Sequence, residues 1–236
     1  MSGAGKTSAV IIGASGGIGA ALESALIDEG TFDVVHGFAR SRSGPQHLDL
    51  RDEASIVAAA AHVANGPMPT LVIVATGLLH DGDQSPEKAL RDLDPDWLAQ
   101  LYAVNAIGPA LVAKHFLPIM PKAGRAVFAA LSARVGSISD NRLGGWHGYR
   151  ASKAALNMLV RTLAIEERRR NDRSIVVTLH PGTVATPLSR PFQTNVPKGR
   201  LFDPERAALQ LLDVIEGLKP SDSGKLFDYQ GEEVPF

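Results

Sequence analysis

Short apolar runs alternate with longer amphipathic stretches along almost the whole chain. The amphipathic stretches repeat their apolar positions every three or four residues, which is typical of helices packed on one face. The pattern predicts strands at residues 8–14, 33–39, 70–75, 126–131, 174–179 and 225–229. It predicts helices at residues 17–29, 52–65, 94–115, 149–169 and 203–218.

Several of the runs, such as Leu71-Val72-Ile73-Val74, are apolar on both strand faces. Such strands are typical of a parallel sheet that helices cover on each side. The alternation therefore predicts an α/β Rossmann fold: a doubly wound, mostly parallel, seven-stranded sheet with helices on both faces. We expect an N-terminal tail at residues 1–7 and a single dinucleotide-binding and catalytic domain at residues 8–236. Irregular segments at 78–92, 132–147 and 187–202 follow strands, so they should wall a crevice at the carboxyl edge of the sheet.

Composition narrows the functional classes. The chain of 236 residues is 44% hydrophobic and 21% charged, which favours a globular domain over a disordered one. A net charge of −1 argues against a nucleic-acid or membrane-surface partner. Without cysteine there is no disulfide, thiolate catalysis or cysteine metal site, and the seven histidines show no metal-ligand spacing, so no metal is expected. The first residues lack the apolar core of a signal peptide, which predicts a cytoplasmic location.

A glycine-rich turn stands between the first predicted strand and the first predicted helix. Glycine allows a tight turn and a close backbone approach to a pyrophosphate, and the helix N-terminus offers free N–H groups to the anion. A turn without any ligand is the alternative, but the position directly after a strand favours nucleotide binding. The residues expected to bind are Gly13, Ser15, Gly16, Gly17, Ile18 and Gly19.

The end of the second predicted strand indicates which dinucleotide is bound. An NAD site usually places a carboxylate there for the ribose 2′-hydroxyl, and none occurs between Asp33 and Asp49. Arg40 and Arg42 follow the strand instead, and they are either ordinary surface arginines or ligands of a 2′-phosphate. The missing carboxylate favours NADP(H) over NAD(H).

Tyr149 and Lys153 are four residues apart at the start of a predicted helix and so share one face. A neighbouring ammonium should lower the pKa of a tyrosine by favouring its phenolate. Tyr149 is then a candidate general acid for a carbonyl oxygen or general base for an alcohol. Most such pairs are ordinary helix surface, so the spacing gains weight only beside the glycine turn.

Together these residues resemble the short-chain dehydrogenase/reductase family over about residues 8–231. Gly13, Gly17 and Gly19 match its glycine turn, although Ile12 stands where the family has threonine. The resemblance implies an adenine contact for Asp49 and Leu50, a catalytic role for Asn105, and a proton relay from Lys153 through Asn105. It further implies a cofactor lining of Ala75, Thr76, Gly77, Tyr149, Lys153, Pro181, Gly182, Val184 and Thr186. A homodimer or homotetramer is also implied.

One departure concerns the family's substrate-orienting serine. Ala133 occupies that position, preceded by Ser132 and followed in the next loop by Ser137. We take Ser132 as the catalytic candidate, with Ser137 as the alternative, although a neighbour along a strand points to the opposite face. Residues 136–141 together with Asn157 are similar to the C-factor and sniffer-like carbonyl reductase branch.

Two functions therefore stay open. The first is an NADP(H)-dependent oxidoreductase that transfers hydride between the nicotinamide and a small-molecule carbonyl or alcohol. The second is a non-catalytic NADP(H)-binding regulatory or signalling protein on the same fold, which Ala133 suggests because the missing hydroxyl would remove an oxyanion donor.

Overall fold

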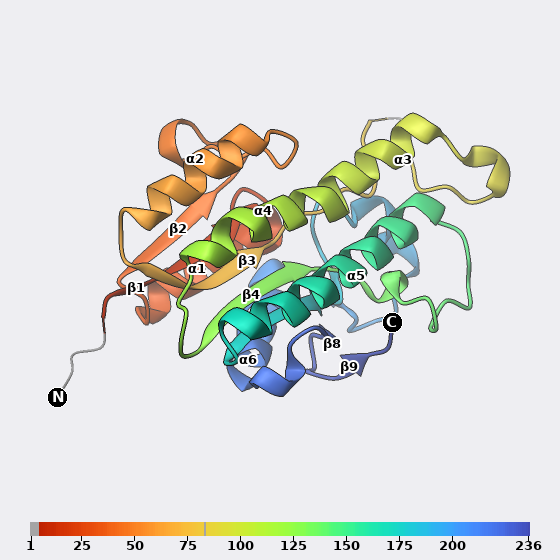
Figure 1. Cartoon of the computed structure of the whole chain (residues 1–236). Helices are drawn as coiled ribbons and strands as arrows, with labels where there is room; N and C mark the ends of the chain where they lie inside the picture. Colours follow the sequence, from red (N-terminus) through yellow and green to blue (C-terminus); the bar gives the residue numbers. More distant parts are fainter. Residues whose placement is uncertain (1–4, 83) are drawn as a thin grey trace.

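The computed structural model describes residues 5–82 and 84–236. Its main sheet has seven strands in the order β2-β1-β3-β4-β5-β8-β9, and neighbouring strands run parallel except β8 and β9 (Figure 1). The fold class expected from the sequence is confirmed. The strands are β1 Thr7–Ile12, β2 Val34–Phe38, β3 Met68–Val74, β4 Ala126–Leu131, β5 Ser174–His180, β8 Leu226–Asp228 and β9 Glu233–Val234.

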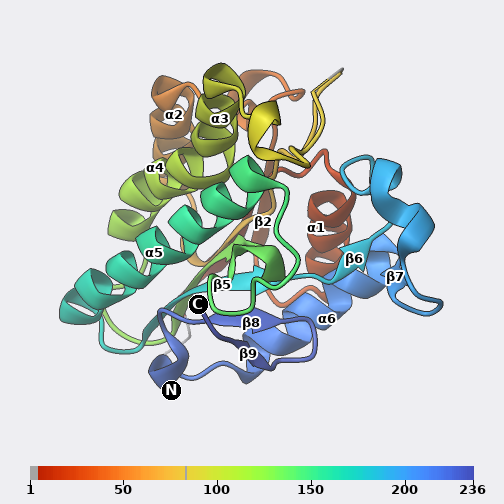
Figure 2. The same cartoon turned by 90° about the vertical axis from the view of Figure 1, so that its right-hand side faces the viewer.

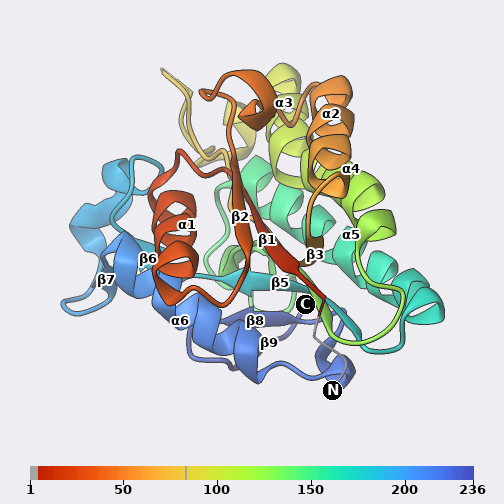
Figure 3. The ribbon, with the colours of Figure 1, turned by 90° about the vertical axis from the view of Figure 1, so that its left-hand side faces the viewer.

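Helices cover both faces of the sheet (Figures 2 and 3). On β1, Ala9 and Ile11 face the core under α1 and α6, whereas Val10 and Ile12 face the core under α2, α4 and α5. This alternation is what a strand buried on both faces requires. The helices are α1 Gly17–Glu29, α2 Glu53–Ala64, α3 Pro95–Tyr102, α4 Gly108–Phe116, α5 His147–Arg170 and α6 Pro204–Gly217.

Three differences from the sequence-based boundaries matter. Thr7, expected in the tail, is the first residue of β1, and residues 1–4 of the tail lie outside the described residues. The antiparallel β9 was not among the expected runs, because a pair of residues is too short to show a period. The segment expected to be irregular after residue 187 contains β7 Leu201–Phe202, which pairs with β6 Thr183–Val184 in a small second sheet.

The single helix expected over residues 94–115 is interrupted. A π-helical turn, Ala103–Ile107, separates α3 from α4. Pro109, in the first turn of α4, has no N–H to donate and its ring crowds the carbonyl four residues back, which is that of Asn105. This widens the turn at Asn105, in keeping with the frequent occurrence of π turns at functional sites.

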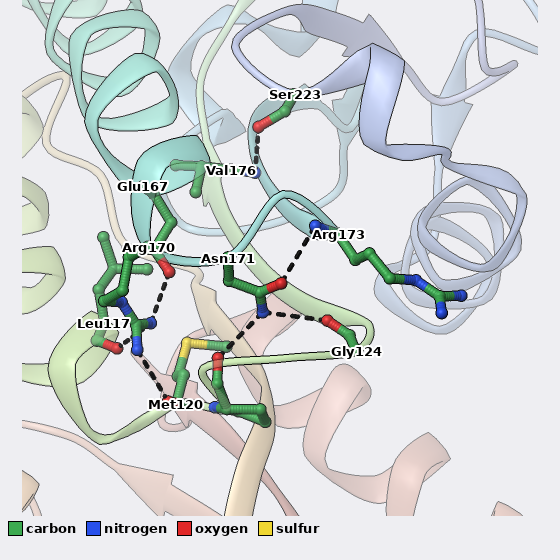
Figure 4. Close-up of polar contacts among 10 residues, drawn as sticks. Leu117, Met120, Gly124, Glu167, Arg170, Asn171, Arg173, Val176 and Ser223 are labelled. Atoms are coloured by element: carbon green, nitrogen blue, oxygen red, sulfur yellow. Dashed lines mark hydrogen bonds and ion pairs between the residues drawn. The ribbon is translucent and has the colours of Figure 1, made fainter.

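The far end of α5 is fixed to the loop that follows α4 (Figure 4). The Arg170 guanidinium donates to the carbonyl oxygens of Leu117 (2.7 Å) and Met120 (3.2 Å), and it pairs with Glu167. The Asn171 amide donates to the carbonyl oxygens of Pro121 and Gly124, both at 3.0 Å. These bonds anchor the C-terminal end of the helix that carries Tyr149 and Lys153 at its start.

In the part of the chain that the structure describes, every helix is too short or too polar to cross a membrane.

Candidate active site

The glycine turn leads from β1 into α1 with little free space. Gly13 has a φ of +95°, and a Cβ there would lie 2.7 Å from the carbonyl oxygen of Ala75. Only glycine accepts both conditions easily. The α1 helix begins after Gly16 with no side-chain cap and no acidic residue in its first turn. Its N-terminal N–H groups and positive dipole potential are therefore free of protein anions, as a pyrophosphate site requires.

The segment after β5 closes over this turn. A Cβ on Gly17 would lie 2.8 Å from Cγ2 of Thr186. Ile18 packs against the small apolar cluster that contains Val184 and Phe202. The structure thus places Val184 and Thr186, both expected in the cofactor lining, directly against the first turn of α1.

Tyr149, Lys153 and Asn105 meet at the carboxyl edge of the sheet. The Lys153 Nζ lies 5.8 Å from the centre of the Tyr149 ring and donates to the carbonyl oxygen of Leu131 at 2.8 Å. A Cβ on Gly77 would lie 3.8 Å from Lys153 Nζ and 3.9 Å from Asn105 Oδ1. The loop after β3 therefore touches both groups and links them to the glycine turn.

The Asn105 side chain is fully buried and held from two sides. Its amide donates to the carbonyl oxygen of Leu78 (2.8 Å) and to the hydroxyl of Ser152 (3.0 Å), and its Oδ1 accepts the Leu78 N–H (2.8 Å). Ser152 in turn donates to the carbonyl oxygen of Tyr149. Sequence reasoning missed Ser152, although its position three residues after Tyr149 puts it on the same helix face.

Burial sets the pKa values of the pair. It raises the pKa of Tyr149 above the ordinary value of 10.0 and lowers that of Lys153 from 10.5 to about 7. The expectation that the ammonium lowers the pKa of Tyr149 is therefore wrong for this structure, because both groups are desolvated and burial disfavours each charged form. Tyr149 is held as a neutral phenol, a form that can donate a proton.

The two serine candidates both form hydrogen bonds with groups other than Tyr149. The Ser132 hydroxyl is buried and donates to Asn157 Oδ1 at 2.8 Å. Ser137 is buried too and accepts the N–H of Asp140 at 3.1 Å. Ala133, in contrast, packs in the cluster around Tyr149. Ser132 as a substrate ligand stays a prediction, and this geometry does not favour it, because strand alternation turns Ser132 to the face opposite Ala133 and its proton is given to Asn157.

The two arginines after β2 also differ. Arg42 forms an ion pair with Glu23 at 2.5 Å and donates to the carbonyl oxygen of Gly37 at 2.7 Å, so its guanidinium is bound within the protein. Arg40 is exposed. Of the adenine-side pair, Asp49 is partly exposed, whereas Leu50 is buried in the main core against Gly108. Nothing in the sequence pointed to Glu23, which lies 19 residues before its partner.

An apolar cluster surrounds Tyr149, and all three expected irregular segments contribute to it. The Trp146 ring lies 6.2 Å from the Tyr149 ring and 5.0 Å from that of Phe192, between ring centres. The other members of this cluster are Leu79, Ala133, Val135 and Leu188. Leu79, Leu188 and Phe192 were missed because loop residues carry no period that would mark their direction.

Comparison with known proteins agrees with this geometry. A sequence profile of the family described as short chain dehydrogenase matches residues 7–197. The protein named C-signal from Myxococcus xanthus is 37% identical over 177 residues, which are 75% of this chain and 98% of that protein.

Two solved structures share the fold over nearly the whole chain. One is an NADPH-bound carbonyl reductase from chicken fatty liver, 25% identical with a TM-score of 0.81, the match covering 99% of this chain and 100% of that one. The other is the carbonyl reductase Sniffer of D. melanogaster, 21% identical with a TM-score of 0.77, covering 98% and 100%. The expected similarity to the C-factor and sniffer-like branch is confirmed, and the chain belongs to the short chain dehydrogenase family.

Proposed function

We propose that the protein is an NADP(H)-dependent oxidoreductase that interconverts a small-molecule carbonyl and its alcohol. One observation carries the proposal: Tyr149, Lys153 and Asn105 converge at the loop after β3, which itself packs on the glycine turn. Membership of the family and the NADPH-bound carbonyl reductase of the same fold support it.

The residues present fit a dinucleotide. The uncapped start of α1 suits the pyrophosphate, and the exposed Arg40 suits a 2′-phosphate. The hydroxyl of Thr76, next to the turn, is buried without a hydrogen-bond partner among the described residues, so a polar ligand group would satisfy it. When bound, NADP(H) supplies or accepts the hydride.

Tyr149 acts on the substrate oxygen. In reduction its phenol donates a hydrogen bond to the carbonyl and then gives up its proton as negative charge develops on that oxygen. Lys153, where protonated, stabilises the phenolate left behind. Asn105 keeps the loop at Leu78 and the helix at Ser152 in a fixed relation. Since Ala133 brings no hydroxyl to this cluster, Tyr149 carries more of the oxyanion stabilisation than it would beside a serine.

The test measures the loss of NADPH absorbance with a panel of aldehydes, ketones and quinones, together with NADPH binding by fluorescence. Tyr149→Phe should lower kcat about 100-fold or more, because general acid catalysis contributes about 100- to 10,000-fold. The NADPH dissociation constant should stay within about threefold. Absence of turnover by the wild type, or full turnover by Tyr149→Phe, would refute the proposal.

The second candidate, a non-catalytic NADP(H)-binding signalling protein, is favoured by one observation, the alanine at position 133 in contact with Tyr149. It predicts NADPH binding without measurable turnover across the same panel. The Tyr149→Phe variant would then behave like the wild type in any partner-dependent assay.

The proposal includes a homo-oligomer. Ile107, Met158 and Ile165 expose 51%, 67% and 53% of their surface on the π turn and α5, an arrangement that supports association of helical faces. Light scattering should give a mass of two or four chains, and Met158→Glu should reduce it.

A further inference from the structure

The start of α5 is an unusual helix entry. Gly144, Gly145 and Trp146 are three consecutive residues with positive φ, at +63°, +65° and +51°. Glycine adopts this region readily, but tryptophan does so only when its surroundings hold it there. Trp146 is the N-cap position of α5, and its side chain makes no capping bond. The conformation of Trp146, which contacts Tyr149, therefore depends on other groups.

Glu87, which lies 61 residues before Gly148, supplies the capping bond that the side chain of Trp146 does not make. Its Oε2 accepts the N–H of Gly148 at 3.1 Å, the second residue of α5, and this is the bond that a capping side chain normally makes. Its main-chain carbonyl accepts the N–H of Trp146 at 2.5 Å. One residue of the loop before α3 thus holds both the left-handed residue and the first turn of the helix. The loop runs close to the start of α5 in Figure 2.

The environment of the Glu87 carboxylate indicates a fitted contact. Only 2% of Glu87 is exposed, and its Oε1 has no hydrogen-bond partner among the described residues. Burying a carboxylate is unfavourable unless nearby groups stabilise it, and the positive end of the α5 dipole does so here. A Cβ on Gly148 would lie 2.7 Å from Glu87 Oε1 and 2.6 Å from Leu101 Cδ1, so glycine makes room for this carboxylate.

We propose that Glu87 is a positioning residue: it sets the place of Trp146 and Tyr149 over the substrate by capping α5 from the loop before α3. This inference rests on the proposed function, because it assigns Tyr149 a catalytic role. What this role requires of Glu87 is an acceptor oxygen within hydrogen-bond distance of the Gly148 N–H. The negative charge of the side chain is secondary.

The experiment compares Glu87→Ala with Glu87→Gln, which keeps an acceptor oxygen at the same reach. Asp92→Ala is the matched control, because Asp92 accepts the N–H groups of Lys88 and Ala89 in the same loop and, among the described residues, forms no hydrogen bond with α5. All variants are made in a Trp97→Phe background, so that Trp146 is the only tryptophan reporting fluorescence. NADPH reduction of the panel substrates gives kcat, and NADPH titration gives the dissociation constant.

Glu87→Ala should lower kcat at least about tenfold, since a 1 Å displacement of a catalytic group costs up to about 100-fold. Its Trp146 emission should shift to longer wavelength, while NADPH affinity stays within about threefold. Glu87→Gln should restore kcat and emission to within about threefold of the parent. Asp92→Ala should keep the kcat and the Trp146 emission of the parent and lose only thermal stability. If Glu87→Ala does not fold, Gly148→Ala replaces it, because the added Cβ displaces the carboxylate and should lower kcat equally.

The inference is overturned if Glu87→Ala keeps kcat and Trp146 emission, or if Glu87→Gln fails to rescue them. Tyr149→Phe separates this failure from that of the proposed function. Loss of turnover in Tyr149→Phe with full turnover in Glu87→Ala removes only the role of Glu87. Full turnover in Tyr149→Phe removes the catalytic assignment itself. Should the parent show no turnover, the emission of Trp146 still decides whether Glu87 positions it.

Discussion

Replacing Ser132 with alanine separates a structural serine from a catalytic one. In the structure the Ser132 hydroxyl is buried and donates to Asn157 Oδ1 at 2.8 Å, whereas its neighbour Ala133 packs in the Tyr149 cluster. The substitution leaves that buried oxygen without its donor, which costs about 1–3 kcal/mol. For a chain of this size each kcal/mol lowers the melting temperature by about 2–4 °C, so a loss of about 2 kcal/mol corresponds to about 4–8 °C.

Activity gives the opposite signature. If Ser132 polarised the substrate, its removal would cost about 100- to 1000-fold in kcat, the usual effect of losing one oxyanion donor. From the geometry we expect kcat to change by less than about twofold. Thermal melts and NADPH turnover on the same preparations decide between the two. A fall of about 100-fold in kcat with an unchanged melting temperature would refute the orientation argued for this strand end.

The converse substitution and three further changes test the rest of the site. Ala133→Ser places a hydroxyl in the Tyr149 cluster and should raise kcat up to about tenfold, as measured by NADPH turnover; no change would mean that position 133 does not face the substrate. Arg40→Ala should weaken NADPH binding at least about tenfold with NADH binding unchanged, whereas Arg42→Ala should mainly lower the melting temperature, because Arg42 is bound to Glu23. Equal effects of the two would contradict the assignment. Lys153→Met tests burial: the folded pKa of Lys153 is about 7 and the unfolded value 10.5, so between these pH values only the unfolded chain binds the proton. The difference in unfolding free energy between wild type and Lys153→Met, measured in urea melts, should therefore rise by roughly 1.4 kcal/mol per pH unit from pH 7 toward 10. Below pH 7 this difference should stay level. A difference that does not change with pH would show that Lys153 is solvated. Asn171→Ala should cost about 1–3 kcal/mol in the same melts while leaving kcat unchanged, because its two carbonyl partners lie at the far end of α5.

The main sheet was predictable because its strands are buried on both faces and leave long apolar runs. A side chain at Gly13 or Gly17 would clash with its neighbours, so both positions require glycine. The glycine turn was predictable because this requirement is visible in the sequence. Tyr149 and Lys153 could be paired because four residues make about one helical turn. In each case the sequence signal is local, lying within one element or at the junction of two.

The remaining features depend on partners distant in the chain. The bond between Arg42 and Glu23, and that between Glu87 and Gly148, join segments whose proximity no period reveals. Desolvation of Tyr149 depends on the whole fold, so the spacing alone gave the wrong direction for its pKa. Ser132 is an intermediate case, because the alternation of side chains along a strand already indicated that Ser132 points to the face opposite Ala133.

The π turn at Ala103–Ile107 has a consequence for how the length of this chain can change. A π turn is equivalent to one residue inserted into a continuous helix, and deletion of one residue there would merge α3 and α4 into a single α-helix. Because the widened turn absorbs the extra residue, α3 and α4 keep the relative rotation of a continuous helix, so the deletion would leave Trp97 and Leu101 in the core and would remove the turn that contains Asn105. A one-residue deletion at this turn is therefore compatible with the packing of α3 and α4 but not with the position of Asn105, whereas a deletion within either helix would turn its buried face by about 100° out of the core.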